Sequence, residues 1–243
     1  MVKVRKETTH GNVKKREVRY NTSMFAVLSA LAAMALLLFL AEILWHRKKL
    51  SGEYARKFVH ILGGSMVAFW PYIMSMRWIQ LIAAGAIVIW VLTRKLDLSH
   101  ALKDINRPTI GELLYPVSVL LAAYLAHEEW IFTVSILFLA LADGMAAVIG
   151  RKFGTKRMTY KVYMGKKTLQ GSIAYLLCAY SALGIGVLLG GSAAITHTPV
   201  LTLGWLPVVC VFLENISPLG TDNITVPLLV VTVLNFAATL ALL

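Results

Sequence analysis

Residues 130–150 read WIFTVSILFLALADGMAAVIG, an apolar run that contains one acidic residue, Asp143. A helix needs about 20 such residues to cross the hydrocarbon core of a bilayer. A carboxylate is costly inside that core, so Asp143 is by default a functional residue. The alternative is a structural role, in which Asp143 pairs with a neighbouring Lys or Arg.

The segment that follows is strongly basic. Residues 151–168 read RKFGTKRMTYKVYMGKKT, with seven Lys or Arg and no acidic residue. Gly154 and Gly165 allow close approach of the backbone to a ligand, and a helix that begins near Thr168 would offer free amide groups to an anion. We therefore predict a site for an anionic, phosphorylated ligand. Membrane topology alone is the other explanation of these charges.

Composition places both segments in a membrane protein. Of the 243 residues, 58% are hydrophobic and 15% are charged, whereas soluble domains carry about 25% charged residues. We predict an all-α fold, a polytopic integral-membrane helical bundle with seven to eight transmembrane helices, because helices satisfy every backbone polar group in lipid. Residues 1–22 form a basic N-terminal tail and residues 23–243 a single transmembrane domain. The apolar runs lie at about 24–45, 58–75, 78–93, 112–126, 130–150, 168–190, 200–215 and 225–243.

The charge distribution predicts the orientation. The net charge is +12, and the loops at 47–57, 94–107 and 151–167 are basic, whereas the connections between them are not. Basic loops face the cytoplasm and attract anionic lipid headgroups, so the predicted site faces the cytoplasm. This assignment places the basic tail outside, which the same rule disfavours. Nucleic acid is not an expected partner, because the basic residues lie in short loops without interleaved aromatic residues.

A second cationic group begins the run at 58–75. Arg56, Lys57 and His60 precede Gly63 and Gly64. A cation above a groove of small residues could hold a phosphate while a lipid approaches closely. The alternative is that Arg56 and Lys57 extend to the membrane interface and that His60 is a buried, hydrogen-bonded histidine.

The last polar group is ENISPLGTDNITVP at 214–227. Asp222 could simply cap the next helix, but Glu214 follows a long apolar run and is not needed for capping. We interpret the group as ligands of a metal ion or of a nucleotide ribose. Arg56, Asp143, the 151–168 loop and Asp222 all fall at the same predicted membrane face.

Four short motifs occur in an order that resembles a known family. They are RKxxH at 56–60, LADG…GRKFG at 141–154, GKKTxxGS at 165–172 and E…DNxTxP at 214–227. Over residues 56–227 the chain resembles the polyprenol/dolichol kinase, phytol kinase and CTP-dependent diacylglycerol kinase family. The resemblance implies a helical membrane enzyme. It also implies transfer of the terminal phosphoryl group of a nucleoside triphosphate, often CTP, to an isoprenoid alcohol or diacylglycerol.

The resemblance, together with the residue types, assigns the site. The expected catalytic residues are Asp143, Arg56, Lys57 and Lys167. Nucleotide binding is expected of Lys152, Gly150, Gly154, Lys166, Thr168, Gly171 and Asn223. Mg²⁺ or a similar divalent cation is expected on Asp143, Asp222 and Glu214, which would bind the triphosphate through it. Asp143 could instead be the general base, and the lipid hydroxyl would enter through a groove lined by Gly63, Gly64 and Gly144.

Two other functions are compatible with such a site. A phosphatidate or polyprenyl-phosphate cytidylyltransferase would use the same groups but release pyrophosphate. The chain lacks the aspartate-rich C-terminal signature expected of those enzymes and ends in an apolar run instead. A non-catalytic lipid transporter or binding protein is less favoured, because transporters place polar groups near the midplane and often show internal repeats.

Overall fold

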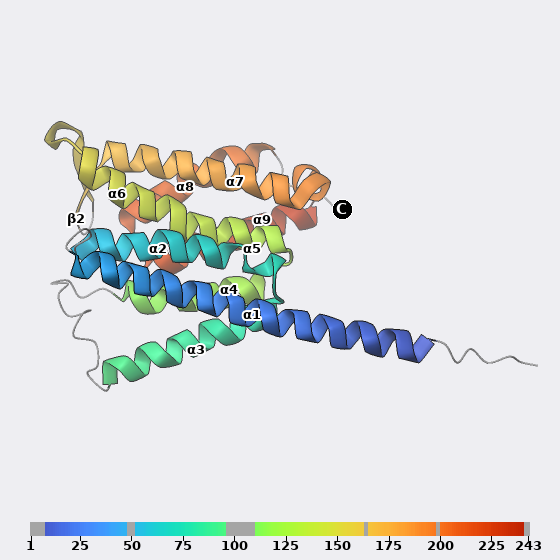
Figure 1. Ribbon diagram of the computed structural model, residues 1–243. Coiled ribbons are helices and arrows are strands. Elements are labelled where there is room, and N and C mark those ends of the chain that lie inside the picture. Colours follow the sequence, from blue (N-terminus) through green and yellow to red (C-terminus); the bar gives the residue numbers. More distant parts are fainter. Residues whose placement is uncertain (1–7, 48–51, 96–109, 163–164, 198–199, 241–243) are drawn as a thin grey trace, which may run out of the picture.

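The computed structural model describes residues 8–47, 52–95, 110–162, 165–197 and 200–240 (Figure 1). Most of these residues lie in helices that run side by side in a bundle. The predicted basic loop at 94–107 and the start of the N-terminal tail lie almost wholly outside the described residues. The long helices are α1 (Thr8–His46), α2 (Gly52–Ala68), α3 (Met76–Lys95), α4 (Gly111–Leu125), α5 (Glu129–Leu137), α6 (Asp143–Phe153), α7 (Leu169–His197), α8 (Val200–Ile216) and α9 (Asp222–Leu240).

Each predicted apolar run overlaps a helix, although the run at 58–75 extends past the end of α2 at Ala68. Not every helix has the length of a membrane span. Five segments among the described residues are long and apolar enough to cross a bilayer, namely Met24–His46, Met76–Thr93, Glu129–Phe153, Leu169–Gly190 and Asp222–Thr239. Helices α4 and α8 are apolar but shorter. The chain is therefore a helical membrane protein, and the count of seven to eight crossings stays a prediction.

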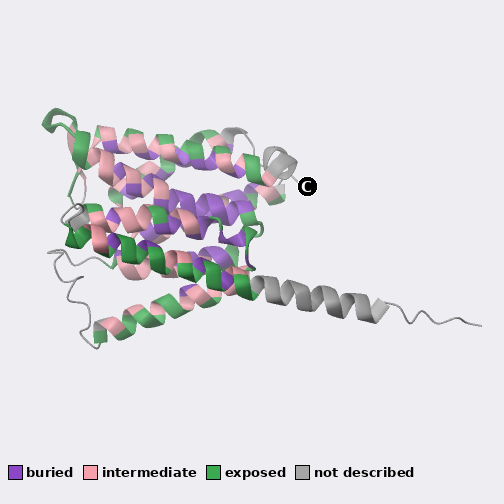
Figure 2. Cartoon of the chain, in the orientation of Figure 1, coloured by how far each residue is buried: buried purple, intermediate pink, exposed green. Residues whose placement is uncertain are grey.

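The segment Glu129–Phe153 forms the centre of the bundle. Every residue from Trp130 to Ala140 is buried, and α5 contacts α2, α7 and α9 (Figure 2). A helix that is apolar on all sides is stable only where neighbours cover all of it, which explains this position. The central helix thus carries Asp143 into the middle of the bundle.

A π-helical turn interrupts this central helix directly before Asp143. The turn, η2, spans Phe138–Ala142, and the backbone N–H of Asp143 donates to the carbonyl of Phe138, five residues back. Turns of this kind are rare and frequently occur at functional sites. It joins α5 to α6, so the two helices form one membrane-length segment with a local change of pitch.

The loop between α6 and α7 contains a β-hairpin, which the all-α prediction did not include. After the short 3₁₀ turn η3 (Lys156–Met158), strand β1 (Thr159–Val162) pairs antiparallel with β2 (Gly165–Thr168). Tyr160 lies opposite Lys167, and Thr159 opposite Thr168. Thr, Tyr and Val favour extended backbone, which accounts for strands in this short polar segment.

Helix α1 runs without a break from Thr8, so the domain boundary predicted at residue 22 does not coincide with a helix start. A second 3₁₀ turn, η1 (Trp70–Tyr72), follows α2. The hairpin and the C-terminal end of α6 lie at one end of the bundle, and the start of α1 extends past the opposite end (Figure 1).

Candidate active site

A polar cavity of about 770 Å³ opens at the end of the bundle that carries the hairpin. It is lined from α2, α4, α6, β2, α7, α8, α9 and the turn before α9. Its size lies within the range of small-molecule sites. Of the residues predicted to form the site, the cavity brings together Arg56, Lys57, Asp143, Gly150, Lys166, Lys167, Thr168, Gly171, Glu214, Asp222 and Asn223.

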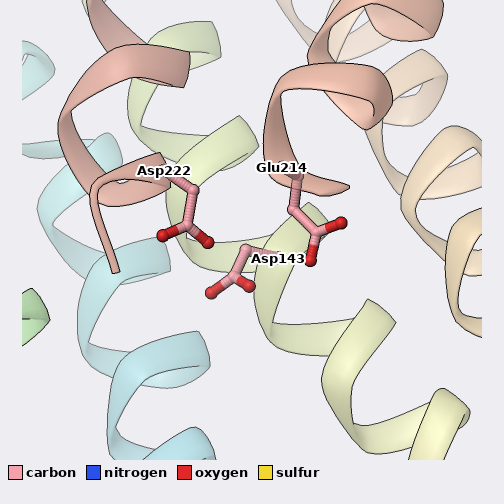
Figure 3. Close-up of side chains that lie close together, drawn as sticks. All are labelled: Asp143, Glu214 and Asp222. Carbon is pink, nitrogen blue, oxygen red and sulfur yellow. The ribbon is translucent and has the colours of Figure 1, made fainter. Parts of the chain in front are cut away.

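Three carboxylates meet in this cavity (Figure 3). Asp143 begins α6, Glu214 lies near the end of α8 and Asp222 begins α9. One oxygen of each carboxylate lies within 4.8 Å of one oxygen of the other two. Magnesium binds oxygen ligands at about 2.1 Å, so opposite ligands are about 4.2 Å apart. Three hard oxygen donors at this separation fit one divalent cation after a small inward movement, and they are the three predicted metal ligands.

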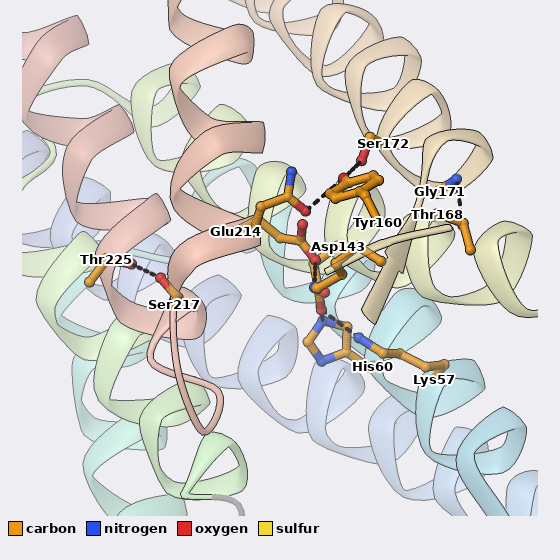
Figure 4. Close-up of polar contacts among 12 residues, drawn as sticks. Lys57, His60, Asp143, Tyr160, Thr168, Gly171, Ser172, Glu214, Ser217 and Thr225 are labelled. Carbon is orange, nitrogen blue, oxygen red and sulfur yellow. Dashed lines mark hydrogen bonds and ion pairs between the residues drawn. The ribbon is translucent and has the colours of Figure 1, made fainter. Parts of the chain in front are cut away.

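Asp143 forms a buried ion pair with Lys57 (Figure 4). Lys57 Nζ lies 2.5 Å from Asp143 Oδ2, and the two side chains are only 7% and 14% exposed. A charge that is buried in this way must be paired, because desolvation is otherwise too costly. Asp143 therefore forms the ion pair with a lysine that the structural alternative predicts, and it also lines the cavity.

His60 lies beside this pair, although it was not among the predicted site residues. Its Nε2 lies 2.9 Å from the carbonyl oxygen of Leu139 and 3.3 Å from Asp143 Oδ2. Both neighbours are acceptors, so Nε2 carries a proton. The sequence signal was the spacing of Lys57 and His60, which places them on one face of α2. His60 thus links Asp143 to the π-helical turn.

Glu214 forms the second ion pair, with Lys167. The Glu214 side chain is 6% exposed and that of Lys167 is 37% exposed. Burial by itself lowers the pKa of Lys167, but the carboxylate of Glu214, through its charge and its hydrogen bond, raises that pKa above the usual value. Lys167 is therefore a cation at neutral pH, held at the carboxylate cluster by β2.

Thr168 caps the first turn of α7. Its Oγ1 accepts a hydrogen bond from the backbone N–H of Gly171 at 3.2 Å, as expected of an N-cap threonine. A Cβ atom on Gly150 would lie 2.8 Å from Thr168 Oγ1, and one on Gly171 would lie 2.9 Å from the carbonyl oxygen of Ala146. These glycines let α6 and α7 cross closely beside the cavity, which is a packing role distinct from the predicted nucleotide binding.

Asn223 joins the start of α9 to the start of α4. Its side-chain amide donates to the carbonyl of Gly111 at 3.0 Å. The turn before α9 lies against the same glycine, since a Cβ on Gly220, at φ +87°, would lie 3.0 Å from Gly111 Cα. The side-chain N–H of Asn223 is thus used within the protein, at a residue that lines the cavity.

Two predicted nucleotide-binding residues do not line the cavity. Helix α6 continues to Phe153, and Lys152 is exposed, with its ammonium 5.3 Å from the centre of the Phe153 ring. Gly154 ends α6, and a Cβ there would collide with the carbonyl of Gly150 and lie 2.7 Å from Thr168. Arg151 lines the cavity; it begins the predicted basic segment but was not among the assigned binding residues.

The predicted lipid groove of small residues is filled by protein. A Cβ on Gly64 would collide with the hydroxyl of Tyr115 and with Ala140, and one on Gly144 with Ile61. Gly63 faces α1, where Met34 Sδ would lie 3.4 Å from its Cβ. The small residues serve the close packing of α2, so the prediction of a lipid entry path along them is wrong.

Three curated proteins resemble this chain. It is 30% identical over 192 residues to phytol kinase of Synechocystis sp., covering 77% of this chain and 81% of that protein. It is 28% identical over 222 residues to probable phytol kinase 2, chloroplastic, of Oryza sativa subsp. japonica, covering 84% and 72%. It is 26% identical over 214 residues to probable phytol kinase 1, chloroplastic, of Glycine max, covering 79% and 70%. No family model matches the chain, and no solved structure matches it.

Proposed function

Because this chain belongs to the family of phytol and polyprenol kinases, we propose that it phosphorylates an isoprenoid alcohol at the cavity that contains Asp143. The chain is a membrane lipid-alcohol kinase, and phytol is the first candidate substrate, since all three relatives are named for it. CTP is the first candidate donor. Diacylglycerol and longer polyprenols are the other acceptors to be compared.

One observation carries this proposal, namely that two ion pairs bring three carboxylates and two lysines together. Lys57 pairs with Asp143, and Lys167 with Glu214, while Asp222 completes the cluster. Phosphoryl transfer needs positioning and charge neutralisation more than covalent chemistry from the protein. A cluster of both signs supports this, because carboxylates suit a cation and ammonium groups suit phosphate oxygens.

The residues have distinct roles in the proposed reaction. The lipid hydroxyl oxygen forms a bond to the terminal phosphorus, the bond between that phosphorus and its bridging oxygen breaks, and the nucleoside diphosphate leaves. Lys57, Lys166 and Lys167 contact phosphate oxygens and offset their charge. Asp143, Glu214 and Asp222 would hold Mg²⁺, which when bound supplies positive charge at the phosphates. Asp143 is also a candidate to accept the proton of the hydroxyl, a role that competes with metal binding.

Isotope transfer tests the reaction class. The purified protein in lipid vesicles receives phytol and CTP labelled at either the α or the γ phosphate. We expect label from the γ position in a lipid monophosphate and none from the α position. Label from the α position would instead establish nucleotidyl transfer and the cytidylyltransferase alternative. Replacing CTP with ATP, GTP or UTP, and phytol with diacylglycerol or a polyprenol, then ranks donors and acceptors.

We also propose that the cavity opens to the cytoplasm. The exposed residues Lys152, Lys156 and Arg157 lie at the same end of the chain's central helix as the cavity, and basic residues at membrane edges favour the cytoplasmic side and anionic headgroups. In the variant Lys156→Cys, the introduced thiol should react with a membrane-impermeant maleimide only after the cells are opened. Reaction in intact cells would reverse the orientation.

A further inference from the structure

Tyr160 makes hydrogen bonds that the proposed reaction does not explain. Its hydroxyl lies 2.5 Å from Ser172 Oγ on α7 and donates to Asn215 Oδ1 on α8 at 3.1 Å. A phenol has one proton to donate, so the Ser172 hydroxyl must donate to the Tyr160 oxygen. Tyr160 does not line the cavity. It is half-buried and ties strand β1 to two helices at once.

The register of the hairpin places Tyr160 directly opposite Lys167. Directly opposite residues of an antiparallel pair project on the same side, with their Cβ atoms about 5 Å apart. Their partners are also neighbours, because Lys167 pairs with Glu214 and Tyr160 bonds to Asn215. A cross-strand pair of the hairpin thus meets two consecutive residues at the end of α8. Figure 4 shows the Tyr160 hydroxyl beside Ser172 of α7.

Lys167 needs such an anchor. Its side chain is long and flexible, and its ammonium reaches Glu214 only if β2 is held beside α8. A two-stranded hairpin is marginally stable in water without further packing. The residues of β2 are exposed or half-buried, with Gly165 and Lys166 exposed. Thr168 holds the C-terminal end of β2 beside α6 and α7, and the Tyr160 hydroxyl holds the opposite strand beside α8.

We propose that Tyr160 is a positioning residue that holds Lys167 at the carboxylate cluster and thereby sets the affinity of the site for the nucleotide phosphates. Its hydroxyl fixes β1 to α7 and α8, and the strand pairing passes this constraint to Lys167. The effect on nucleotide affinity rests on the proposed function. The constraint on Lys167 does not, so the two parts are measured separately.

The first measurement follows Lys167 itself. Tyr160→Phe removes the hydroxyl and keeps the ring. The matched control is Tyr180→Phe, which removes the hydroxyl bond from α7 to the carbonyl of Gly204 at 2.8 Å, in the membrane-spanning part of α7. The protein in vesicles is acylated with a water-soluble amine reagent, and the modification of each lysine is followed by peptide mass spectrometry.

We expect Tyr160→Phe to raise the acylation rate of Lys167 by roughly two- to tenfold, the factor for losing a hydrogen bond of ordinary strength. Lys161 and Lys166, both exposed in the same hairpin, should react at unchanged rates. Tyr180→Phe should leave Lys167 at its original rate. An unchanged Lys167 rate in Tyr160→Phe overturns the proposal. Should that variant fail to fold, Ser172→Ala removes one of the two bonds and should give a smaller increase, and no increase there overturns the proposal too.

The second measurement tests nucleotide affinity. Tyr160→Phe should raise KM for the nucleotide by roughly two- to tenfold and leave KM for the lipid alcohol unchanged. In a Lys167→Met background the same change should have no further effect, because Tyr160 acts through Lys167. Additive effects would instead show a general structural role and overturn the positioning role. If the unmodified protein transfers no phosphoryl group, the proposed function fails, while the acylation rates still decide the role of Tyr160.

Discussion

Replacing Asp143 with asparagine should lower both activity and stability, for separable reasons. The Asp143 and Lys57 side chains are 14% and 7% exposed, with 2.5 Å between the paired atoms. Removing one partner of a buried pair costs about 3–5 kcal/mol, because the other charge stays inside without compensation. Asparagine keeps an oxygen that can accept from Lys57, so we expect the lower end, about 3 kcal/mol. For a chain of this size, that lowers Tm by roughly 6–12 °C.

The control for this prediction is the double variant Lys57→Met/Asp143→Asn, which removes both charges. Its Tm should return to within a few degrees of the original, since replacing a whole buried pair is often nearly neutral. Phosphoryl transfer should be lost in Asp143→Asn and should not return in the double variant. The assays are tryptophan fluorescence on heating in detergent and transfer of γ-label to lipid. Near-original activity in Asp143→Asn refutes the catalytic assignment, and an unchanged Tm refutes the energetic one.

Three further outcomes follow from the described contacts. Gly64→Ala should destabilise the fold by about 1–3 kcal/mol through overpacking, whereas Gly85→Ala, which meets nothing within 4 Å, should not lower Tm. Without nucleotide, Lys167→Met should raise the affinity for Mn²⁺ about tenfold or more, because it removes a competing cation from Glu214. Lys166→Met, at an exposed residue, should have less effect. Electron paramagnetic resonance measures Mn²⁺ binding in both variants. Glu214 raises the pKa of Lys167. The unmodified protein should therefore have a higher Tm than Lys167→Met at neutral pH, and Tm measured against pH should show this difference vanish only as the pH rises through the raised pKa.

The sequence predicts the helices well because their signal is local. Each predicted run overlaps a helix, since a segment of 15 or more mostly apolar residues permits little else in a membrane. We assigned the carboxylates of Asp143, Glu214 and Asp222 to one site because a charge in or beside an apolar run has few explanations other than function. The structure brings these three together within 4.8 Å. Their roles as metal ligands stay a prediction.

The incorrect predictions concern sequence patterns that indicate close packing but do not identify the packing partner. Gly64 and Gly144 correctly indicated a close approach, but the approaching groups are Tyr115, Ala140 and Ile61 instead of a lipid. Only tertiary structure decides which surface faces a glycine. The hairpin was missed because four-residue strands are too short for a clear alternation.

Lys152 lies away from the cavity for a simpler reason. The basic segment was treated as a loop from residue 151, but α6 continues to Phe153. At about 100° per residue, a position nine residues after Asp143 lies on the opposite face of a helix. Gly150, seven residues on, shares the face of Asp143 and lines the cavity. Once the end of α6 is known, helical periodicity therefore places Lys152 on the helix face opposite Asp143.

The π-helical turn at Phe138–Ala142 makes the central helix one residue longer than a regular α-helix over the same rise. If the same residues formed a regular α-helix without this turn, everything beyond it would be rotated by about 100° around the helix axis. Asp143 would then turn away from Lys57 while α5 kept its packing. The turn therefore sets the rotation between the packed half of this helix and the half that lines the cavity.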